Sequence, residues 1–149
     1  MTPWTLTDFL RESLHIEGIE REPTAPEFQA TAEFLAANHL STVRIKALVA
    51  VYAPHAVLRD RIGLDVRVGT HIAPPGGPNI TERLRSFCDR VNGRAWDAYE
   101  AHHIYEALHP FTDGNGRSGR AIWLWQQRGH APIGFLHRWY YDTLQRGRA

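Results

Sequence analysis

One twelve-residue stretch constrains this chain more than any other. Residues 109–120 read HPFTDGNGRSGR, with apolar residues at helical intervals before them over 96–108 and an apolar run, 121–125, directly after them. His109 precedes Pro110, which disfavours the helical backbone at His109, so the first helix must end there. The chain therefore should hold two helices joined by a short polar loop.

The glycines indicate what this loop does with its backbone. Gly114 and Gly116 flank Asn115, and all three residue types tolerate positive φ. Their amide N–H groups can therefore turn toward one point at the start of the second helix. Such a set of amides at a helix N-terminus favours phosphate.

The side chains of the stretch suit the same chemistry. Arg117 and Arg120 are three apart, so we expect them on neighbouring surface positions, where both can reach one polyphosphate. Asp113 is a hard ligand that can bind Mg²⁺ together with phosphate oxygens and waters. His109, on a loop and titrating near neutrality, can accept a proton from a hydroxyl. The alternative is a surface loop whose glycines only make a turn.

The stretch resembles the signature of the Fic family, H-x-F-x-[DE]-G-N-G-R-x-x-R, and matches each fixed position. The resemblance implies a protein adenylyltransferase, which transfers AMP from MgATP to a Ser, Thr or Tyr hydroxyl of a target protein. It makes His109 the general base and Asp113 the Mg²⁺ ligand. Family relatives that transfer UMP or phosphocholine leave the donor open.

The resemblance also implies how the nucleotide is held. Gly114, Asn115 and Gly116 form the anion hole for the α- and β-phosphates. Arg117 contacts the β-phosphate and Arg120 holds the γ-phosphate. Relatives called Doc carry lysine at the position of Gly116 and transfer phosphate instead, so the glycine here favours nucleotidyl transfer.

A helix is expected at the start of the chain. Thr5 and Asp8 form a variant of the capping box, and apolar residues recur up to Gly18, a suitable residue to end the helix. Ser13 and Glu17 share one face. A glutamate in the last helical turn is electrostatically unfavourable unless a cation compensates it.

The segment around these residues resembles the inhibitory motif of Fic proteins, [ST]-x-x-x-E-[GN]. The resemblance makes residues 1–18 an inhibitory helix, with Ser13 in the motif and Glu17 paired with Arg120 against the γ-phosphate. In some relatives the same glutamate positions water to remove AMP, so removal of AMP stays an alternative activity. The simpler alternative is a solvated glutamate at a helix end.

Alternating apolar and polar residues over 64–69, then Gly69 and a proline-glycine cluster, predict a short hairpin. In Fic proteins a β-hairpin flap lies over the active site and aligns the target by main-chain pairing. We therefore assign the flap to residues 62–73, against the alternative of an ordinary edge hairpin. The target would dock on four of them: Val66, Arg67, Val68 and Gly69.

Further helices are predicted over 27–38, from a Ser41 cap, from an Asn79 or Thr81 cap, over 96–108 with Ile104 on its buried face, and over 133–144. The expected fold is an all-α Fic fold, a compact helical bundle with a small β-hairpin flap over the active site, in a single domain of residues 1–149.

Composition bounds the partners and the compartment. A net charge of +1 disfavours nucleic acid, and the absence of an apolar span or a signal segment argues against a membrane. Cys88 is the one cysteine, which is typical of a reducing cytoplasm. The family resemblance implies that the partner is an unidentified target protein or the enzyme itself, and the sequence does not indicate the oligomeric state. A nucleotide-binding regulatory module without turnover stays a further alternative.

Overall fold

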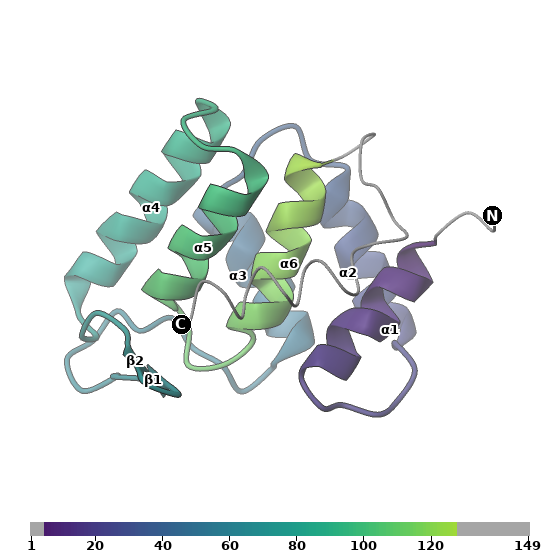
Figure 1. Ribbon diagram of the computed structural model, residues 1–149, viewed down its shortest axis with the longest axis horizontal. Helices are drawn as coiled ribbons and strands as arrows, with labels where there is room; N and C mark the ends of the chain where they lie inside the picture. Colours follow the sequence, from purple (N-terminus) through teal and green to yellow (C-terminus); the bar gives the residue numbers. More distant parts are fainter. Residues whose placement is uncertain (1–4, 128–149) are drawn as a thin grey trace.

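The computed structural model describes residues 5–127, which form six helices and one two-stranded hairpin (Figure 1). The predicted all-α bundle with a small hairpin is confirmed. Its elements are α1 (Leu6–Ile16), α2 (Ala25–Leu35), α3 (Thr42–Tyr52), β1 (Arg67–Val68), β2 (His71–Ile72), α4 (Pro78–Asn92), α5 (Ala98–Leu108) and α6 (Asn115–Gln126).

Local side chains explain where several helices start and end. The Thr5 side chain accepts from the Asp8 amide at 3.1 Å, and the Asp8 carboxylate accepts from the Thr5 amide at 3.0 Å, which is the predicted cap of α1. Gly18 has φ +73° and its N–H donates to the His15 carbonyl, so α1 ends as predicted. Ser41 caps α3, also as predicted.

Other predicted boundaries were wrong. Helix α4 starts after Gly77, with Pro78 as its first residue, so Asn79 and Thr81 lie inside its first turn. Proline suits this position because it lacks the N–H that would be unpaired there. Ile104 on α5 is 36% exposed and does not belong to the core face. Helix α2 runs from Ala25 to Leu35 and not over 27–38. The predicted helix over 133–144 lies outside the described residues.

Helices α5 and α6 lie at the centre of the bundle, between α4 on one side and α2 and α1 on the other (Figure 1). The Tyr105 hydroxyl and Ser118 Oγ join them at 2.7 Å. The His102 ring donates from Nδ1 to the Gly119 carbonyl at 3.1 Å, which makes His102 a core histidine. The most deeply buried apolar side chains around this pair are Phe9, Ile45, Ile80, Leu84, Tyr105 and Ile122.

The loop between α5 and α6 lies at one edge of the bundle, between the hairpin and the C-terminal end of α1 (Figure 1). A bridge pairs Leu58 with Phe111, and Thr112 donates its N–H to the Val57 carbonyl at 3.0 Å. Phe111 is 2% exposed, so it anchors the loop in the core. The segment that precedes the hairpin therefore fixes this loop along its length.

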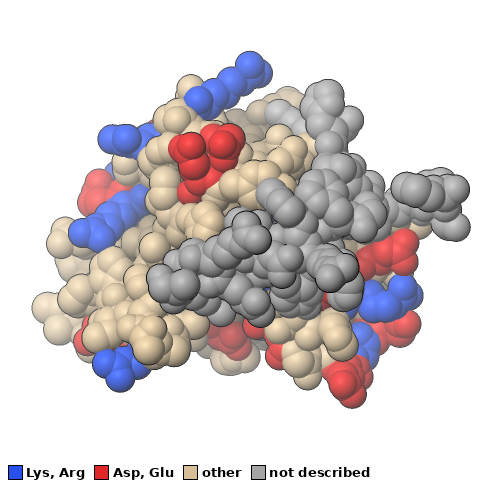
Figure 2. All heavy atoms as spheres, in the orientation of Figure 1, with Lys and Arg blue, Asp and Glu red and all other residues tan. Residues whose placement is uncertain are grey.

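The surface carries charges of both signs. On the face shown in Figure 2, basic and acidic groups of the described residues are interspersed, with no broad basic field among them. In the part of the chain that the structure describes, we find no helix with the length and apolar character that crossing a membrane requires.

Candidate active site

His109 ends α5 with a left-handed backbone, φ 50° and ψ 61°. Its Nδ1 lies 3.3 Å from the Glu106 carbonyl oxygen, which can only accept, so Nδ1 carries the proton. The other ring nitrogen, Nε2, then has the free lone pair when the ring is neutral. His109 is thus arranged as a base through Nε2.

The surroundings of His109 keep its ring neutral. Burial is the main cause that lowers its pKa below the ordinary value, and the Arg59 guanidinium and the nearby His71 ring lower it further. The Glu106 carbonyl and the Glu17 carboxylate act in the opposite direction and do not reverse the shift. At neutral pH the imidazole can therefore accept a proton.

The loop backbone differs from the predicted set of converging amides. Of Gly114, Asn115 and Gly116, only Gly114 has positive φ, +80°, because Asn115 and Gly116 are already the first residues of α6. The Ser118 amide donates to the Gly114 carbonyl at 3.0 Å and starts the helical bonds. The amides of residues 115–117 therefore precede the helical ladder and face out of the α6 N-terminus, which still favours an anion.

The Asn115 side chain holds this geometry. Its Oδ1 accepts from the Phe111 amide at 2.9 Å, and its Nδ2 donates to the Phe111 carbonyl at 2.8 Å. Asn115 is 2% exposed. The side chain thus closes the loop on itself, and only its backbone amide is left to face a ligand.

Asp113 lies beside the amide end of α6. Its Oδ1 accepts from the Gly114 amide at 2.7 Å, and its Oδ2 lies 2.8 Å from His55 Nε2. Burial alone would raise the pKa of Asp113, but the Gly114 and His55 hydrogen bonds and the nearby Arg117 outweigh it, so the pKa falls below the ordinary value. Asp113 is therefore a charged oxygen ligand at neutral pH.

The surroundings of Asp113 fit a metal that arrives with its substrate. Within residues 5–127, no group of three His, Cys, Asp or Glu side chains is placed to hold an ion. Asp113 would supply one ligand to Mg²⁺, and phosphate oxygens and water would supply the rest.

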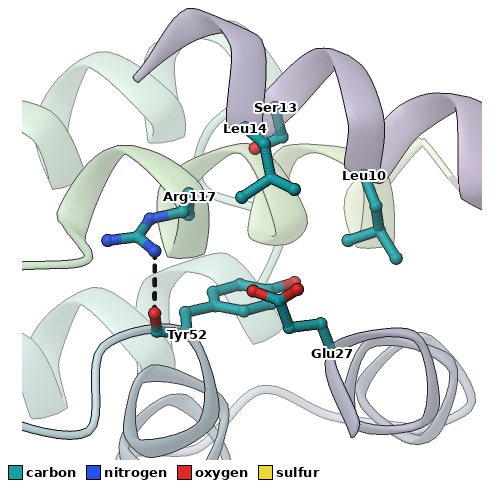
Figure 3. Close-up of a pocket in the computed structure, with 6 residues that line it drawn as sticks. All are labelled: Leu10, Ser13, Leu14, Glu27, Tyr52 and Arg117. Carbon is teal, nitrogen blue, oxygen red and sulfur yellow. Dashed lines mark hydrogen bonds between the residues drawn. The ribbon is translucent and has the colours of Figure 1, made fainter. Parts of the chain in front are cut away.

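The predicted surface position of Arg117 is wrong. The residue is only 9% exposed. Its Nη1 donates to the Tyr52 carbonyl at 2.7 Å, under α1 (Figure 3). Its Nη2 lies 3.6 Å from Asp113 Oδ1. Arg117 is buried because α1 and α3 cover this side of α6. A cavity of about 10 Å³, close to the size of one water, lies between Arg117, Leu10 and Glu27.

Arg120 is also buried, at 3% exposure, because α1 covers it. Its Nε donates to Ser13 Oγ at 2.8 Å, and its Nη2 donates to the Ser13 carbonyl at 3.0 Å. Nη2 also pairs with Glu17 Oε1 at 2.9 Å. The contact predicted between Glu17 and Arg120 is therefore present, together with Ser13.

The Glu17 carboxylate lies directly over the start of α6. A Cβ built on Gly116 would collide with Glu17 Oε1, and it would lie 3.1 Å from Arg120 Nη1. The Glu17 side chain is 35% exposed, whereas that of Arg120 is 4% exposed. Glu17 thus reaches in from the solvent side to the two groups expected to hold phosphates.

A family model described as the Fic/DOC family matches residues 35–126, more than half of the chain. The chain belongs to the Fic/DOC family. This family is known for AMPylation and related transfers to protein targets, with nucleotide substrates and typically a divalent metal. The matched range of this Fic protein contains the loop and the hairpin but not α1, so the helix that carries Glu17 lies outside it.

The Fic hairpin forms within the predicted residues 62–73. Arg67 pairs with Ile72 and Val68 with His71, around a turn at Gly69, where φ is +59°. His71 Nε2 donates to the Ala107 carbonyl at 2.9 Å and ties β2 to the last turn of α5. The hairpin therefore lies next to His109 in space, although docking of a target on it stays a prediction.

Three residues that contribute to the site were not predicted from the sequence. They are His55, which faces Asp113; the Tyr52 carbonyl, which holds Arg117; and Arg59, which contacts the His109 carbonyl. Each lies 50 or more residues from its partner along the chain. None belongs to a local pattern, so spacing gave no signal for them.

Proposed function

We propose that this Fic protein is a protein adenylyltransferase that uses MgATP to modify a Ser, Thr or Tyr hydroxyl of a target protein. One observation carries the proposal. The Nε2 side of the neutral His109 ring, the charged Asp113 and the free amides of the α6 N-terminus belong to one six-residue loop and the helix start that follows it. A base, a metal ligand and an anion site in this order suit attack on a phosphate.

The residues act in sequence. Gly114, Asn115 and Gly116 form the anion hole, in which the free amides at the start of α6 hold the α- and β-phosphates. His109 Nε2 takes the proton from the target hydroxyl as its oxygen attacks the α-phosphorus. The bond from the α-phosphorus to the bridging oxygen breaks, and pyrophosphate leaves with the electron pair. Mg²⁺ held by Asp113 would neutralise charge on the phosphates.

The proposed arginine roles follow the same direction. Arg117, beside Asp113, contacts the β-phosphate, and Arg120 holds the γ-phosphate through charge-assisted hydrogen bonds. The hairpin residues Val66, Arg67, Val68 and Gly69 align the target through main-chain pairing next to His109.

Glu17 restrains the enzyme in this proposal. Its carboxylate and a γ-phosphate are both anions that require the same face of Arg120. While Glu17 and Ser13 hold Arg120, ATP cannot seat its terminal phosphate for in-line attack. The resting protein is therefore expected to be slow.

Isotope placement tests the reaction type. In the Glu17→Gly variant, which lacks the proposed restraint, ATP labelled at the α-phosphorus should label protein, and ATP labelled at the γ-phosphorus should not. His109→Ala should abolish the labelling while ATP still binds. Transfer of the γ-label would indicate a kinase, and tight ATP binding with no labelled product would indicate a regulatory module.

Removal of AMP is a second candidate, favoured by the position of the Glu17 carboxylate over Gly116. A carboxylate there can orient a water toward a bound phosphodiester. This activity requires that Glu17→Gly loses removal of AMP from a modified protein, whereas the proposed transferase gains activity from the same change.

A further inference from the structure

Arg59 is a buried cation at the end of α5. Along the chain it lies between α3 and β1, and it is fully buried, at 0% exposure. Its Nε donates to the His109 carbonyl at 2.6 Å, and its Nη2 donates to the Leu108 carbonyl at 2.9 Å. These carbonyls carry the partial negative charge of a helix C-terminus, which stabilises a cation there.

The same guanidinium also holds both ends of the hairpin. Nη1 donates to the Leu64 carbonyl at 3.0 Å, before β1, and to the Pro74 carbonyl at 2.8 Å, after β2. The Arg59 backbone adds two bonds of 2.9 Å, from its N–H to the Pro110 carbonyl and from the Gly77 N–H to its own carbonyl. One residue thus joins the flap, the α5 end and the start of α4.

The four side-chain acceptors are main-chain carbonyls of residues 64, 74, 108 and 109. Arg59 therefore fixes the positions of backbone segments. The rigid planar fork of arginine allows donors on three nitrogens to reach carbonyls in different directions, which the single ammonium of lysine cannot do.

We infer that Arg59 is a positioning residue that sets the distance between the flap and His109, so that a target held on the flap presents its hydroxyl to the base. The catalytic part of this inference rests on the proposed function. The geometric part, that Arg59 couples the flap to the loop of His109, does not.

The nucleotide side of the site is separate from this coupling. Arg117 bonds to Tyr52, and Arg120 bonds to Ser13 and Glu17. Arg59 belongs to neither set of bonds. A change at Arg59 should therefore alter flap order and the environment of His109 but leave ATP affinity in place.

The test compares Arg59→Met and Arg59→Lys with Arg85→Lys, a control at an arginine whose side chain is 64% exposed on α4. In Arg59→Met, flap amides such as that of Ala73 should exchange with deuterium at least about tenfold faster. The pKa of His109, read from its ring resonances by NMR, should rise, because a nearby cation is lost while His71 and Glu17 stay in place. Arg59→Lys should fall between Arg59→Met and the wild type.

Two further readouts separate the possible outcomes. ATP affinity, measured by calorimetry in the Glu17→Gly background, should change by less than about twofold. An unchanged exchange rate and an unchanged pKa of His109 in a folded Arg59 variant would overturn the inference. A Glu17→Gly protein that transfers no AMP would remove the proposed function, but exchange and pKa would still decide whether Arg59 couples the two segments.

A measurement on the wild type covers the case in which both variants fail to fold. Exchange of the flap amide of Ala73 and the loop amide of Thr112 can be followed against urea. If Arg59 joins the two segments, both amides open in one step with the same free energy. Opening of the flap at a much lower free energy than the loop overturns the inference.

Discussion

His109 combines an unusual backbone with a neutral side chain. A backbone φ of 50° is a sparsely populated conformation for a non-glycine residue. It persists here because hydrogen bonds of Arg59, Pro110 and Phe111 fix the adjoining backbone. Burial keeps the pKa of the ring below its ordinary value near 6.5. The ring can therefore accept a proton at neutral pH without help from an ion pair.

The lowered pKa of His109 predicts how the rate of AMP transfer depends on pH. A protonated ring cannot accept a proton, so the transfer rate of the Glu17→Gly variant should fall as pH drops through the lowered pKa of His109. The rate should be level from about pH 7 upward. Initial rates between about pH 5 and pH 8 measure it. A rate that still rises steeply above neutral pH would show that His109 is not the group that titrates.

Gly116 and Glu17 should be energetically coupled. Alanine suits a helix better than glycine by up to about 1 kcal/mol, but here its Cβ meets the Glu17 carboxylate. Gly116→Ala should therefore be more favourable in the Glu17→Gly background than in the wild type. Urea unfolding of the four proteins in this cycle measures the coupling, and equal effects in both backgrounds would mean that Glu17 does not lie over Gly116.

At the scale of elements, α1 is held by more than its charged contact. Phe9, Leu10 and Leu14 are 1%, 4% and 3% exposed, so the helix contributes directly to the core. Glu17 is presented to Arg120 by this packing. Loss of packing and loss of the carboxylate should both free Arg120, but only the first should cost much stability.

Leu14→Ala tests whether loss of α1 packing both lowers stability and frees Arg120. It should lower the free energy of unfolding by about 2–5 kcal/mol and also raise AMP transfer, because α1 leaves the core more often. Leu84→Ala on α4, at a position 0% exposed, is the matched control. It should destabilise without activating. Urea unfolding measures the loss of stability, and the rate of AMP transfer measures activation. Equal activation by both variants would contradict a specific role of α1.

The helices could be predicted from the sequence where the signals are local. Thr5 with Asp8, Gly18 and Ser41 mark their helix ends through neighbouring residues alone. The exact first residue of α6 could not be predicted, because the first two turns of the helix are polar and carry no apolar period. They are buried only because other elements, such as α1 and α3, cover them.

At the scale of the whole molecule, the site depends on contacts between distant segments. Glu17 and Arg120 are 103 residues apart, and their pairing could be predicted only because both belong to motifs of known relatives. His55, Tyr52 and Arg59 belong to no such motif, and the fold alone brings them to the site. The family match covers residues 35–126, so α1, the proposed restraining helix, lies outside the matched range.

The central claim is that Glu17 and the γ-phosphate compete for Arg120. The most direct measurement compares incorporation of α-labelled AMP by the wild type, by Glu17→Gly and by the control Glu20→Gly, whose glutamate is exposed just after α1. Glu17→Gly should label protein at least about tenfold faster than the wild type, and Glu20→Gly should match the wild type. Equal labelling by all three, or slower labelling by Glu17→Gly, would contradict the account.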